Sequence, residues 1–327
     1  MSQSVSTMTM AAALNAGLRT SMEADPKVIL MGEDIGKLGG VFRITEGLQK
    51  DFGEDRVIDT PLAESGIVGT AIGLAVSGFR PVVEIQFDAF VYPAYDQIVT
   101  QLAKIHSRTA GTQALPVTLR IPYGGGIGSP EHHSESPESV FAHHAGLRLM
   151  TASDPHSAYW MTQEAISSDD PVIIFEPKRR YWMRGEVDTD QSGTLGDARI
   201  LSDGTDVTLV TYGPLTTVAR TVVEQADQLG ISVELVDLLS LNPLGLDLVE
   251  ESVRRTGRLV IGHEAPTFLG LGAELSARMV ERAFYHLEAP IARVGGFHLP
   301  YPPARLEEHY LPDLDRLLDA VEDVMTH

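Results

Sequence analysis

The sequence of 327 residues contains no cysteine. Disulfide bonds, thiolate metal sites and cysteine nucleophiles are therefore excluded. Basic residues are also scarce, because 25 lysines and arginines stand against 45 acidic residues and leave a formal net charge of −20. Nucleic acids and anionic membranes are bound by clustered lysine and arginine side chains, so we expect neither as a partner.

Long hydrophobic runs are absent as well. No apolar run approaches the roughly 18 to 20 residues that span a bilayer, and residues 1–7 lack the basic-then-apolar layout of a signal peptide. The apolar share of 43% is nevertheless that of a globular protein with hydrophobic cores. We therefore expect a cytoplasmic protein.

Short apolar runs alternate with helical patterns along almost the whole chain. This alternation is typical of parallel sheets that are covered by helices. The strand-sized runs lie at 28–31, 81–87, 116–121, 147–151, 171–175, 207–211, 233–238, 259–262 and 291–294. The helical patterns include 10–22, 63–77, 94–106, 156–166 and 215–229. The sequence predicts an α/β protein with two doubly wound parallel-sheet domains.

A change of composition marks the predicted domain boundary. Glycine, aspartate, threonine and serine are frequent in residues 185–204, as they are in a linker or a surface excursion. We therefore expect one domain at 1–184, a linker at 185–204 and a second domain at 205–327.

The segment 59–64 (DTPLAE) has the chemistry of a helix start. Thr60 can cap the helix, Pro61 suits its first position, and Glu64 falls in the opening turn, where the helix dipole favours a carboxylate. Capping alone would explain Glu64. The stretch 66–75 is small and apolar, however, so the helix is predicted to be buried. A carboxylate at the mouth of a buried helix is a candidate proton donor or acceptor.

The segment 84–93 (EIQFDAFVYP) is a strand that runs into a polar and aromatic turn. Ligands of open α/β sheets collect at the carboxyl ends of the strands, so Gln86, Phe90 and Tyr92 are candidate pocket walls. An ordinary aromatic core is the alternative interpretation.

A glycine-rich loop at 122–128 is followed by Glu131, His132 and His133. Such a loop can approach a ligand closely, but it lacks the lysine and hydroxyl residue of a phosphate-binding loop. Adjacent histidines rarely bind one metal ion, and the zinc pattern H-E-x-x-H is absent. The histidines are either a surface pair or a functional acid or base on a mobile loop.

Taken in order, these segments resemble the E1 β subunits of the branched-chain 2-oxoacid, pyruvate and acetoin dehydrogenase complexes, which are transketolase-like proteins. The resemblance covers nearly the whole chain. It is carried by the segments 32–36 (GEDIG), 39–42 (GGVF), 59–64 (DTPLAE), 84–87 (EIQF), 133–138 (HSESPE), 175–178 (FEPK), 295–297 (GGF) and 300–302 (PYP).

The resemblance implies a pyrimidine-binding domain at 1–184, a transketolase C-terminal-like domain at 205–327 and an α2β2 heterotetramer. In the family the E1 α subunit binds the thiamine diphosphate jointly with β and holds the diphosphate through Mg²⁺, with a Gly-Asp-Gly motif and a later asparagine. Gly-Asp-Gly does not occur here, and the asparagines are Asn15 and Asn242. We therefore expect an enzyme that is active only with an α subunit.

The resemblance also assigns cofactor-binding residues. Glu64 matches the glutamate that hydrogen-bonds the aminopyrimidine ring of the cofactor, where it acts catalytically. Phe90 matches the aromatic residue that packs on this ring. Glu33, Leu62 and Gln86 match neighbouring cofactor contacts.

Substrate and cation sites follow in the same way. His133 matches the catalytic histidine implicated in passing the acyl group to the lipoyl domain of the E2 acyltransferase, whose peripheral-subunit-binding domain docks on E1. Phe90, Tyr92 and His133 are expected to contact the 2-oxoacid substrate. A monovalent-cation (K⁺) site of some members matches Val117, Ala165, Ile166, Ser168 and Asp170.

The implied activity is oxidative decarboxylation of a 2-oxoacid with reductive acylation of the lipoyl group. The segments 84–87 and 176–178 are most similar to the branched-chain enzymes, so a branched-chain 2-oxoacid is the first expectation and pyruvate or acetoin chemistry the alternative. A mainly structural, E2-docking subunit is the alternative of a different class. Glu135 and Asp154 depart from the family pattern and receive no role.

Overall fold

The computed structural model describes residues 5–327, and the chain divides into two compact units. The first unit comprises the residues up to Tyr123 together with Val140–Leu195. The second comprises Gly124–Ser139 and Gly196–His327. The segment expected to be a linker, 185–204, contains most of strand β8 and all of strand β9.

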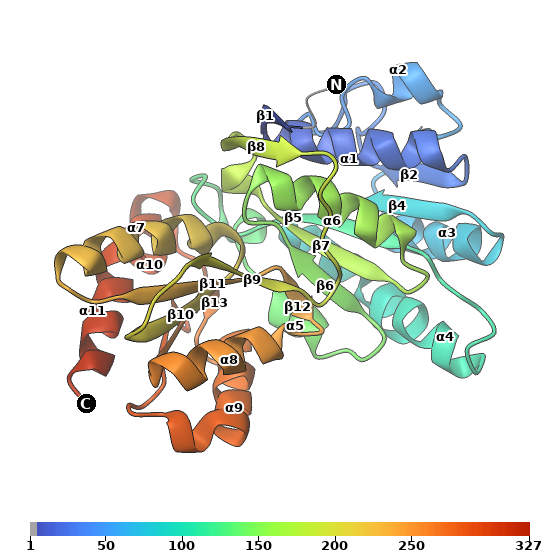
Figure 1. The fold of residues 1–327 in the computed structure, drawn as a ribbon. Coiled ribbons are helices and arrows are strands. Elements are labelled where there is room, and N and C mark those ends of the chain that lie inside the picture. The colour runs from blue at the N-terminus through green and yellow to red at the C-terminus, as the bar shows by residue number, and fades with distance from the viewer. Residues whose placement is uncertain (1–4) are drawn as a thin grey trace. The chain divides into compact units, whose positions relative to one another are not determined.

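A parallel sheet forms the first unit (Figure 1). Its six strands lie in the order β6-β7-β5-β4-β2-β3, and every neighbouring pair is parallel. The bounds are β2 Val28–Gly32, β3 Val57–Asp59, β4 Arg80–Glu84, β5 Thr118–Tyr123, β6 Arg148–Thr151 and β7 Val172–Pro177. A separate antiparallel pair joins β1 Val5–Thr9 to β8 Arg184–Asp188. The predicted strand positions are therefore confirmed, with shifts at their ends.

Helices connect the strands of this unit. They are α1 Met10–Ala24, α2 Leu48–Phe52, α3 Glu64–Val76, η1 Asp88–Ala94, η2 Gln97–Leu102, α4 Ala103–Arg108, α5 Glu138–Ala142 (which starts in the second unit), α6 Pro155–Ser167 and η4 Lys178–Arg180. Helix α1 packs on α6. The crossing is close, because a Cβ added at Gly17 would lie 2.7 Å from the carbonyl oxygen of Tyr159.

Two local predictions differ from the structure. The helix expected at 94–106 is a 3-10 turn, a π turn and a short α-helix in succession. Pro93 explains part of this, because proline has no N–H for a regular helical ladder. Thr60 does not cap α3, since the N-cap residue is Ala63 and no side chain of the described residues caps the helix.

Asp154, which departs from the family pattern, caps α6. Its carboxylate accepts the N–H of Ser157 at 2.8 Å, and the Ser157 hydroxyl accepts the N–H of Asp154 at 3.1 Å. This reciprocal arrangement is a capping box with Pro155 at the first helical position. The aspartate therefore has a structural explanation.

The second unit is also an α/β sheet. Its strands lie in the order β14-β13-β10-β11-β9, with β9 antiparallel at the edge. The strands of this sheet are β9 Ala198–Ser202, β10 Val207–Thr211, β11 Val233–Leu238, β13 Leu259–Pro266 and β14 Ala292–Gly296, and the unit also contains β12 Ser240–Asn242 outside this sheet. The helices are η3 Glu131–His133, η5 Gly213–Leu215, α7 Thr216–Gln228, α8 Leu246–Thr256, α9 Leu271–Ala283, η6 Phe284–His286, η7 Ala304–Leu306, α10 Glu307–Tyr310 and α11 Leu314–Met325.

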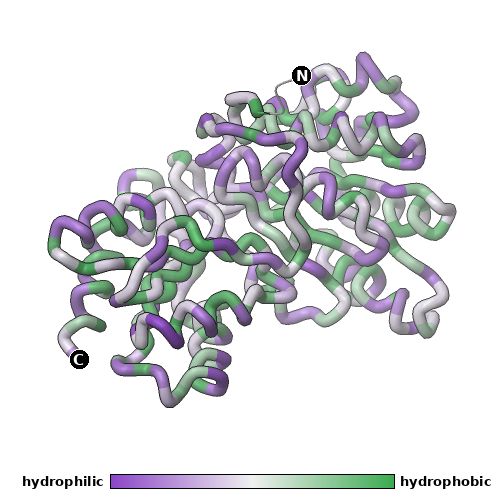
Figure 2. The backbone as a smooth tube through the Cα atoms, in the orientation of Figure 1, coloured by the Kyte–Doolittle hydropathy of each residue, from purple (hydrophilic) through white to green (hydrophobic). Residues whose placement is uncertain are grey.

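Each unit has its own hydrophobic core. In the second unit the core is made where α7 and α11 cover the sheet, with Leu215, Val222, Leu235, Val260 and Leu317 among its fully buried members. Figure 2 shows hydrophobic and hydrophilic stretches alternating along the backbone. The expected α/β class with two sheet domains is confirmed. Among the described residues, no helix has the length and apolar character required to cross a membrane.

Candidate active site

The cofactor-binding residues predicted in the first unit gather at one edge of its sheet. Strands β4, β2 and β3 are parallel neighbours, so their carboxyl ends lie at the same edge. Glu33 directly follows β2, Glu64 follows β3 after a short turn, and Gln86 and Phe90 follow β4. Ligands of open α/β sheets bind at this edge. The topology therefore brings together residues that the sequence keeps apart.

Glu64 is the first residue of α3 and is buried, with 8% of its surface exposed. Its position at the helix N-terminus favours a negative charge. Ile67 and Val68 in the next turn are buried as well. Among residues 5–327, no hydrogen bond or ion pair reaches the Glu64 carboxylate. The Glu64 oxygens are not among the fully buried atoms without a partner, so they are accessible to a donor from a bound molecule.

Glu33 is the second carboxylate at this edge. Burial raises the pKa of Glu33, and the negative charges of Glu64 and Asp34 raise it further. The two predicted cofactor carboxylates therefore interact electrostatically.

Asp59 fixes the loop that follows β2. Its carboxylate accepts the N–H groups of Gly36, at 2.6 Å, and Lys37, at 3.3 Å. The hydroxyl of Thr45 closes the same loop by donating to the carbonyl of Ile35 at 2.6 Å. These bonds hold in place the segment that begins with Glu33.

Aromatic rings line the end of β4. Phe87 meets Phe42 and Phe90 edge to face, with ring centroids 5.5 and 5.9 Å apart. Tyr92 is 42% exposed and Leu62 is 79% exposed. In the single chain, these two predicted contact residues are therefore exposed where another molecule could reach them.

A buried ionic network lies in the same sheet, and sequence reasoning gave its members no role. Arg120 of β5 donates to Glu176 of β7 at 2.7 and 3.0 Å and to Glu84 of β4 at 2.8 Å. The hydroxyl of Tyr181 donates to Glu176 at 2.7 Å. All four residues are buried. The network links three neighbouring strands through their side chains.

Asp88 and Lys178 form a second buried pair. The ammonium and carboxylate atoms are 2.8 Å apart, and both side chains are fully buried. Asp88 is the first residue of η1, which also carries Phe90 and Tyr92. The pair therefore holds the start of the aromatic turn. The sequence indicated Lys178 only through the resemblance of the segment 175–178.

The residues predicted to bind a monovalent cation lie near the end of α6 and in two adjoining strand segments. Ala165 and Ile166 belong to the last turn, and Ser168 is the C-cap residue. The Ser168 hydroxyl donates to the carbonyl of Asp170 at 3.0 Å. The carbonyl of Val117 accepts the N–H of Val172 at 3.1 Å. Both carboxylate oxygens of Asp170 already have partners, His106 at 2.8 Å and Arg148 at 2.8 Å.

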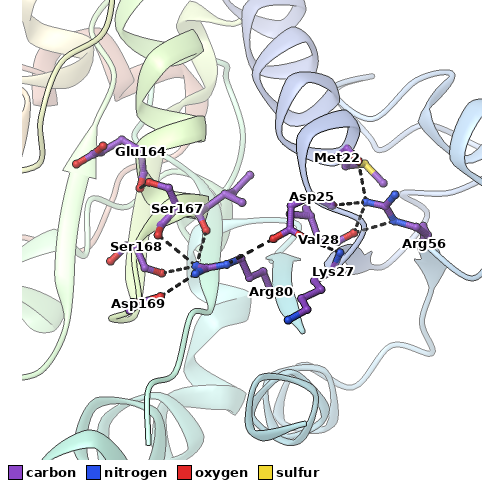
Figure 3. Close-up of polar contacts among 11 residues, drawn as sticks. Met22, Asp25, Lys27, Val28, Arg56, Arg80, Glu164, Ser167, Ser168 and Asp169 are labelled. Carbon is purple, nitrogen blue, oxygen red and sulfur yellow. Dashed lines mark hydrogen bonds and ion pairs between the residues drawn. The ribbon is translucent and has the colours of Figure 1, made fainter. Parts of the chain in front are cut away.

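Arg80 already presents a cation to the end of this helix (Figure 3). Its guanidinium donates to the carbonyls of Ile166, Ser167 and Ser168 at 3.1, 3.2 and 3.0 Å, and to the carboxylate of Asp169 at 2.7 Å. The last carbonyls of a helix attract positive charge. The K⁺ site remains a prediction beside this arginine.

The glycine-rich loop of the second unit binds the protein's own carboxylates. Gly126 and Gly128 have φ of +86° and +71°, a conformation that glycine adopts readily. Turns of this kind aim neighbouring amides at an anion. Gly125 N–H donates to Glu264, and the amides of Gly126 and Gly128 donate to the two oxygens of Glu307 at 2.8 and 3.0 Å. The loop expected to approach a ligand thus holds internal anions.

His133 ends the short helix η3 in the second unit. It is half-buried, and its ring stands perpendicular to that of His132, with centroids 4.3 Å apart. Glu64 belongs to the first unit, so the two predicted catalytic residues lie in different units. In the described part of the chain, no group of three or more histidine, aspartate or glutamate residues could hold a metal ion.

Comparison with known proteins identifies the architecture. The family model of the transketolase pyrimidine binding domain matches residues 6–183, and that of the transketolase C-terminal domain matches residues 196–317. A protein of Leifsonia xyli subsp. xyli named pyruvate dehydrogenase E1 component subunit beta is 57% identical, over 97% of this chain and 95% of its own length. The chain belongs to the family of E1 β subunits of 2-oxoacid dehydrogenases.

Other E1 β relatives carry a different substrate in their names. A Mycobacterium tuberculosis protein named 3-methyl-2-oxobutanoate dehydrogenase subunit beta is 53% identical over 97% of this chain and 92% of its own length. The 2-oxoisovalerate dehydrogenase subunit beta of Pseudomonas aeruginosa is 43% identical over 99% and 96%. A solved chain titled split gene transketolase, inactive beta4 tetramer, shares the fold with a TM-score of 0.81, 21% identity and 98% coverage of both chains.

E1 enzymes of this family depend on thiamine diphosphate, and their β subunits work with an α subunit. The sheet edge of this E1 β chain fits the pyrimidine end of that cofactor. The Thr60 hydroxyl is a buried polar atom that has no hydrogen-bond partner in the described residues. The sequence lacks the Gly-Asp-Gly motif for the diphosphate end. The residues present therefore fit the ring end of the cofactor.

Proposed function

We propose that this E1 β chain, assembled with an α subunit, catalyses the thiamine-diphosphate-dependent oxidative decarboxylation of a 2-oxoacid and the reductive acylation of the lipoyl group of E2. The carboxylate of the largely buried residue Glu64 carries this proposal, because no donor from residues 5–327 meets it. Its place at the carboxyl edge of β4, β2 and β3 is where a sheet of this type binds ligands.

Glu64 would hydrogen-bond a ring nitrogen of the aminopyrimidine. A charge-assisted hydrogen bond is strongest in a water-poor site, so a buried carboxylate orients the ring and stabilises one tautomer of it. Glu33 would interact electrostatically with Glu64 in this site, since its pKa is raised by burial and then by the charge of Glu64. When bound, thiamine diphosphate supplies the electron sink for the electrons released as CO₂ leaves.

The remaining contacts are divided between cofactor and substrate. Phe90 would pack on the pyrimidine ring, with Leu62 and Gln86 beside it. Tyr92 and Phe90 would contact the 2-oxoacid. His133 would donate a proton during acyl transfer to the lipoyl group. Mg²⁺ would be held by the α subunit with the diphosphate, and K⁺ by the residues around the end of α6.

The exposed face of α3 supports assembly with an α subunit. Gly69 and Gly73 lie exposed on this helix, and a Cβ added at either would meet no heavy atom of residues 5–327 within 4 Å. Packing inside this chain therefore does not require glycine at these positions. Glycine does allow another backbone to approach closely. The exposed Leu62 next to the same helix N-terminus would be covered by the same partner.

A branched-chain 2-oxoacid is the first candidate substrate, because the segments 84–87 and 176–178 resemble that branch most. Pyruvate is the second candidate, and the name of the relative at 57% identity favours it. An assay of the assembled enzyme against pyruvate, 2-oxoisovalerate and 2-oxobutyrate separates them. The candidate with the highest kcat/KM is the substrate class.

Glu64→Gln tests the catalytic proposal in the enzyme reconstituted with its α subunit. The amide keeps the size of the side chain but removes the charge, so we expect decarboxylation to fall by roughly 100-fold or more, within the range of a lost acid or base. Glu54→Gln, an exposed position in the same unit, is the matched control. Full decarboxylation by intact Glu64→Gln heterotetramers would favour the structural, E2-docking role instead.

A further inference from the structure

Residues 124–135 form a loop that is closed on itself. The N–H of Gly124 donates to the carbonyl of Glu135 at 2.9 Å and shuts the base. The hydroxyl of Ser134 donates to the carbonyl of Ser129 at 3.1 Å and ties the two sides together. Ser134 is buried. His133, adjacent to Ser134, is thereby fixed to the side of the loop that contains Ser129.

That side of the loop is held by one carboxylate. Glu307, the first residue of α10, accepts the amides of Gly126 and Gly128, one on each oxygen. The hydroxyl of Tyr301 donates to the same carboxylate at 2.6 Å and orients it. Gly128 directly precedes Ser129. Covalent and hydrogen bonds therefore run without interruption from Glu307 through Gly128 and Ser129 to Ser134, next to His133.

We propose that Glu307 is a positioning residue that sets the loop carrying His133 by binding the amides of Gly126 and Gly128 in a two-pronged arrangement. Within this proposal Glu307 touches neither cofactor nor substrate. The inference rests on the proposed role of His133 in acyl transfer. According to this inference, the glycine-rich loop positions a catalytic histidine and does not itself bind a ligand.

The geometry requires a carboxylate. Each oxygen of Glu307 accepts one N–H, and one of them also accepts the Tyr301 hydroxyl. A glutamine at this position keeps one oxygen but turns an NH₂ donor toward the second amide. The loop would then lose one hydrogen bond, and the NH₂ group of the glutamine would point at a glycine N–H, which is also a donor. Its neighbour Glu308 is exposed, so Glu308→Gln changes the same charge without touching the loop.

The test uses the α2β2 enzyme with a lipoyl domain of E2 as acceptor. Two rates are measured: reductive acylation of the lipoyl domain and decarboxylation with an artificial electron acceptor. We expect Glu307→Gln to lower acylation by roughly tenfold to a hundredfold, the effect of a small misplacement of a catalytic group, and decarboxylation by much less. Glu308→Gln should change neither rate. Equal losses in both rates for Glu307→Gln would overturn the proposal.

Hydrogen exchange gives a readout of the loop itself. Peptides covering 124–135 should exchange faster in Glu307→Gln than in wild type, while peptides from the sheet of the second unit should not change. Tyr301→Phe keeps the carboxylate and should give a smaller change in the same direction. If Glu307→Gln unfolds, Tyr301→Phe alone decides, and unchanged exchange in 124–135 would refute the positioning role.

A double-mutant cycle separates this inference from the proposed function. If Glu307 acts through His133, adding Glu307→Gln to His133→Ala should reduce acylation no further. Normal acylation by His133→Ala would refute the proposed role of the histidine, and the inference with it. Impaired acylation by His133→Ala together with normal acylation by Glu307→Gln would refute only the positioning role.

Discussion

Glu33 and Glu64 lie close enough at neighbouring strand ends for the charge of Glu64 to raise the pKa of Glu33, after the larger effect of burial. The two residues follow β2 and β3, which are parallel neighbours. Their interaction is a property of the folded sheet, because they are 31 positions apart in the sequence. The two carboxylates therefore interact in the chain without a bound cofactor.

Removing the charge of Glu64 should lower the pKa of Glu33. We expect the infrared band of protonated carboxyl groups in the β chain to lose one component at a lower pH in Glu64→Gln than in wild type. Asp34→Asn should shift the same component in the same direction by a smaller amount, since Asp34 is the third cause of the raised pKa. Glu33→Gln identifies the component by deleting it. An unchanged titration in Glu64→Gln would contradict the coupling.

Gly73→Ala should stabilise the isolated β chain and weaken its association with α. Alanine in a helix interior is favoured over glycine by about 0.5 to 1 kcal/mol, and the added methyl meets nothing in residues 5–327. Urea unfolding measures the first effect and sedimentation with the α subunit the second. Gly17→Ala is the contrasting variant, because its methyl would lie 2.7 Å from the carbonyl oxygen of Tyr159 and should destabilise the β chain. Unimpaired assembly of Gly73→Ala would exclude this face of α3 from the interface.

Arg120→Met should destabilise the chain severely. It leaves the carboxylates of Glu84 and Glu176 buried without their cation, a situation that costs about 3 to 5 kcal/mol. The loss should shrink in acid, because protonation removes the unpaired charges. Arg220→Met, on the exposed face of α7, is the control. Urea unfolding at pH 5 and pH 8 measures both, and an equal loss at the two pH values would mean that charge burial is not the cause.

Glu138→Gln should change how stability depends on pH. Burial raises the pKa of Glu138 to about 7, although the hydrogen bond from the Tyr212 hydroxyl lowers it. The folded chain therefore retains a proton that the unfolded chain releases near 4.5, and wild-type stability falls as the pH rises from about 4.5 to about 7. A neutral glutamine avoids this loss, which is on the order of 3 kcal/mol.

The comparison is made between two unfolding curves. Burial also lowers the pKa of His263 from 6.5 to about 4, so the stability of the folded chain falls as the pH drops below 6.5. That contribution is present in both proteins and cancels in the difference. Wild type and Glu138→Gln should agree near pH 4 and diverge up to about pH 7. Glu131→Gln, at an exposed position of the same unit, should follow wild type throughout, and a constant offset between Glu138→Gln and wild type would contradict the titration.

Local patterns were sufficient to predict nine of the strands and the helices α1, α3, α6 and α7. Runs such as 207–211 and 233–238 appear in the structure with the predicted bounds, because strands of a parallel sheet that is covered on both faces are mostly apolar. The sequence also predicted Glu64 in the first turn of a helix, and it is the first residue of α3, although one face of that helix is exposed in this chain. The predicted capping of this helix was wrong, since Thr60 lies outside the helix and Ala63 occupies the N-cap.

The side-chain pairs could not be predicted in this way. Asp88 and Lys178 stand 90 positions apart, and Glu307 meets Gly126 across 181. Nothing local to either residue indicates its partner, because the contact depends on how whole strands and units fold. Asp154 is the opposite case. Its capping box with Ser157 involves four consecutive residues and could have been recognised from the sequence.

The path of the chain through its two units limits how this protein can be recombined. The backbone enters the second unit at Gly124, leaves it after Ser139 and returns at Gly196. A chimera that joins two relatives only at residue 195 would therefore pair the glycine loop of one parent with the carboxylates of the other. An exchange of C-terminal halves would keep the loop that carries His133 together with its matching Glu307 only if residues 124–139 were exchanged as well.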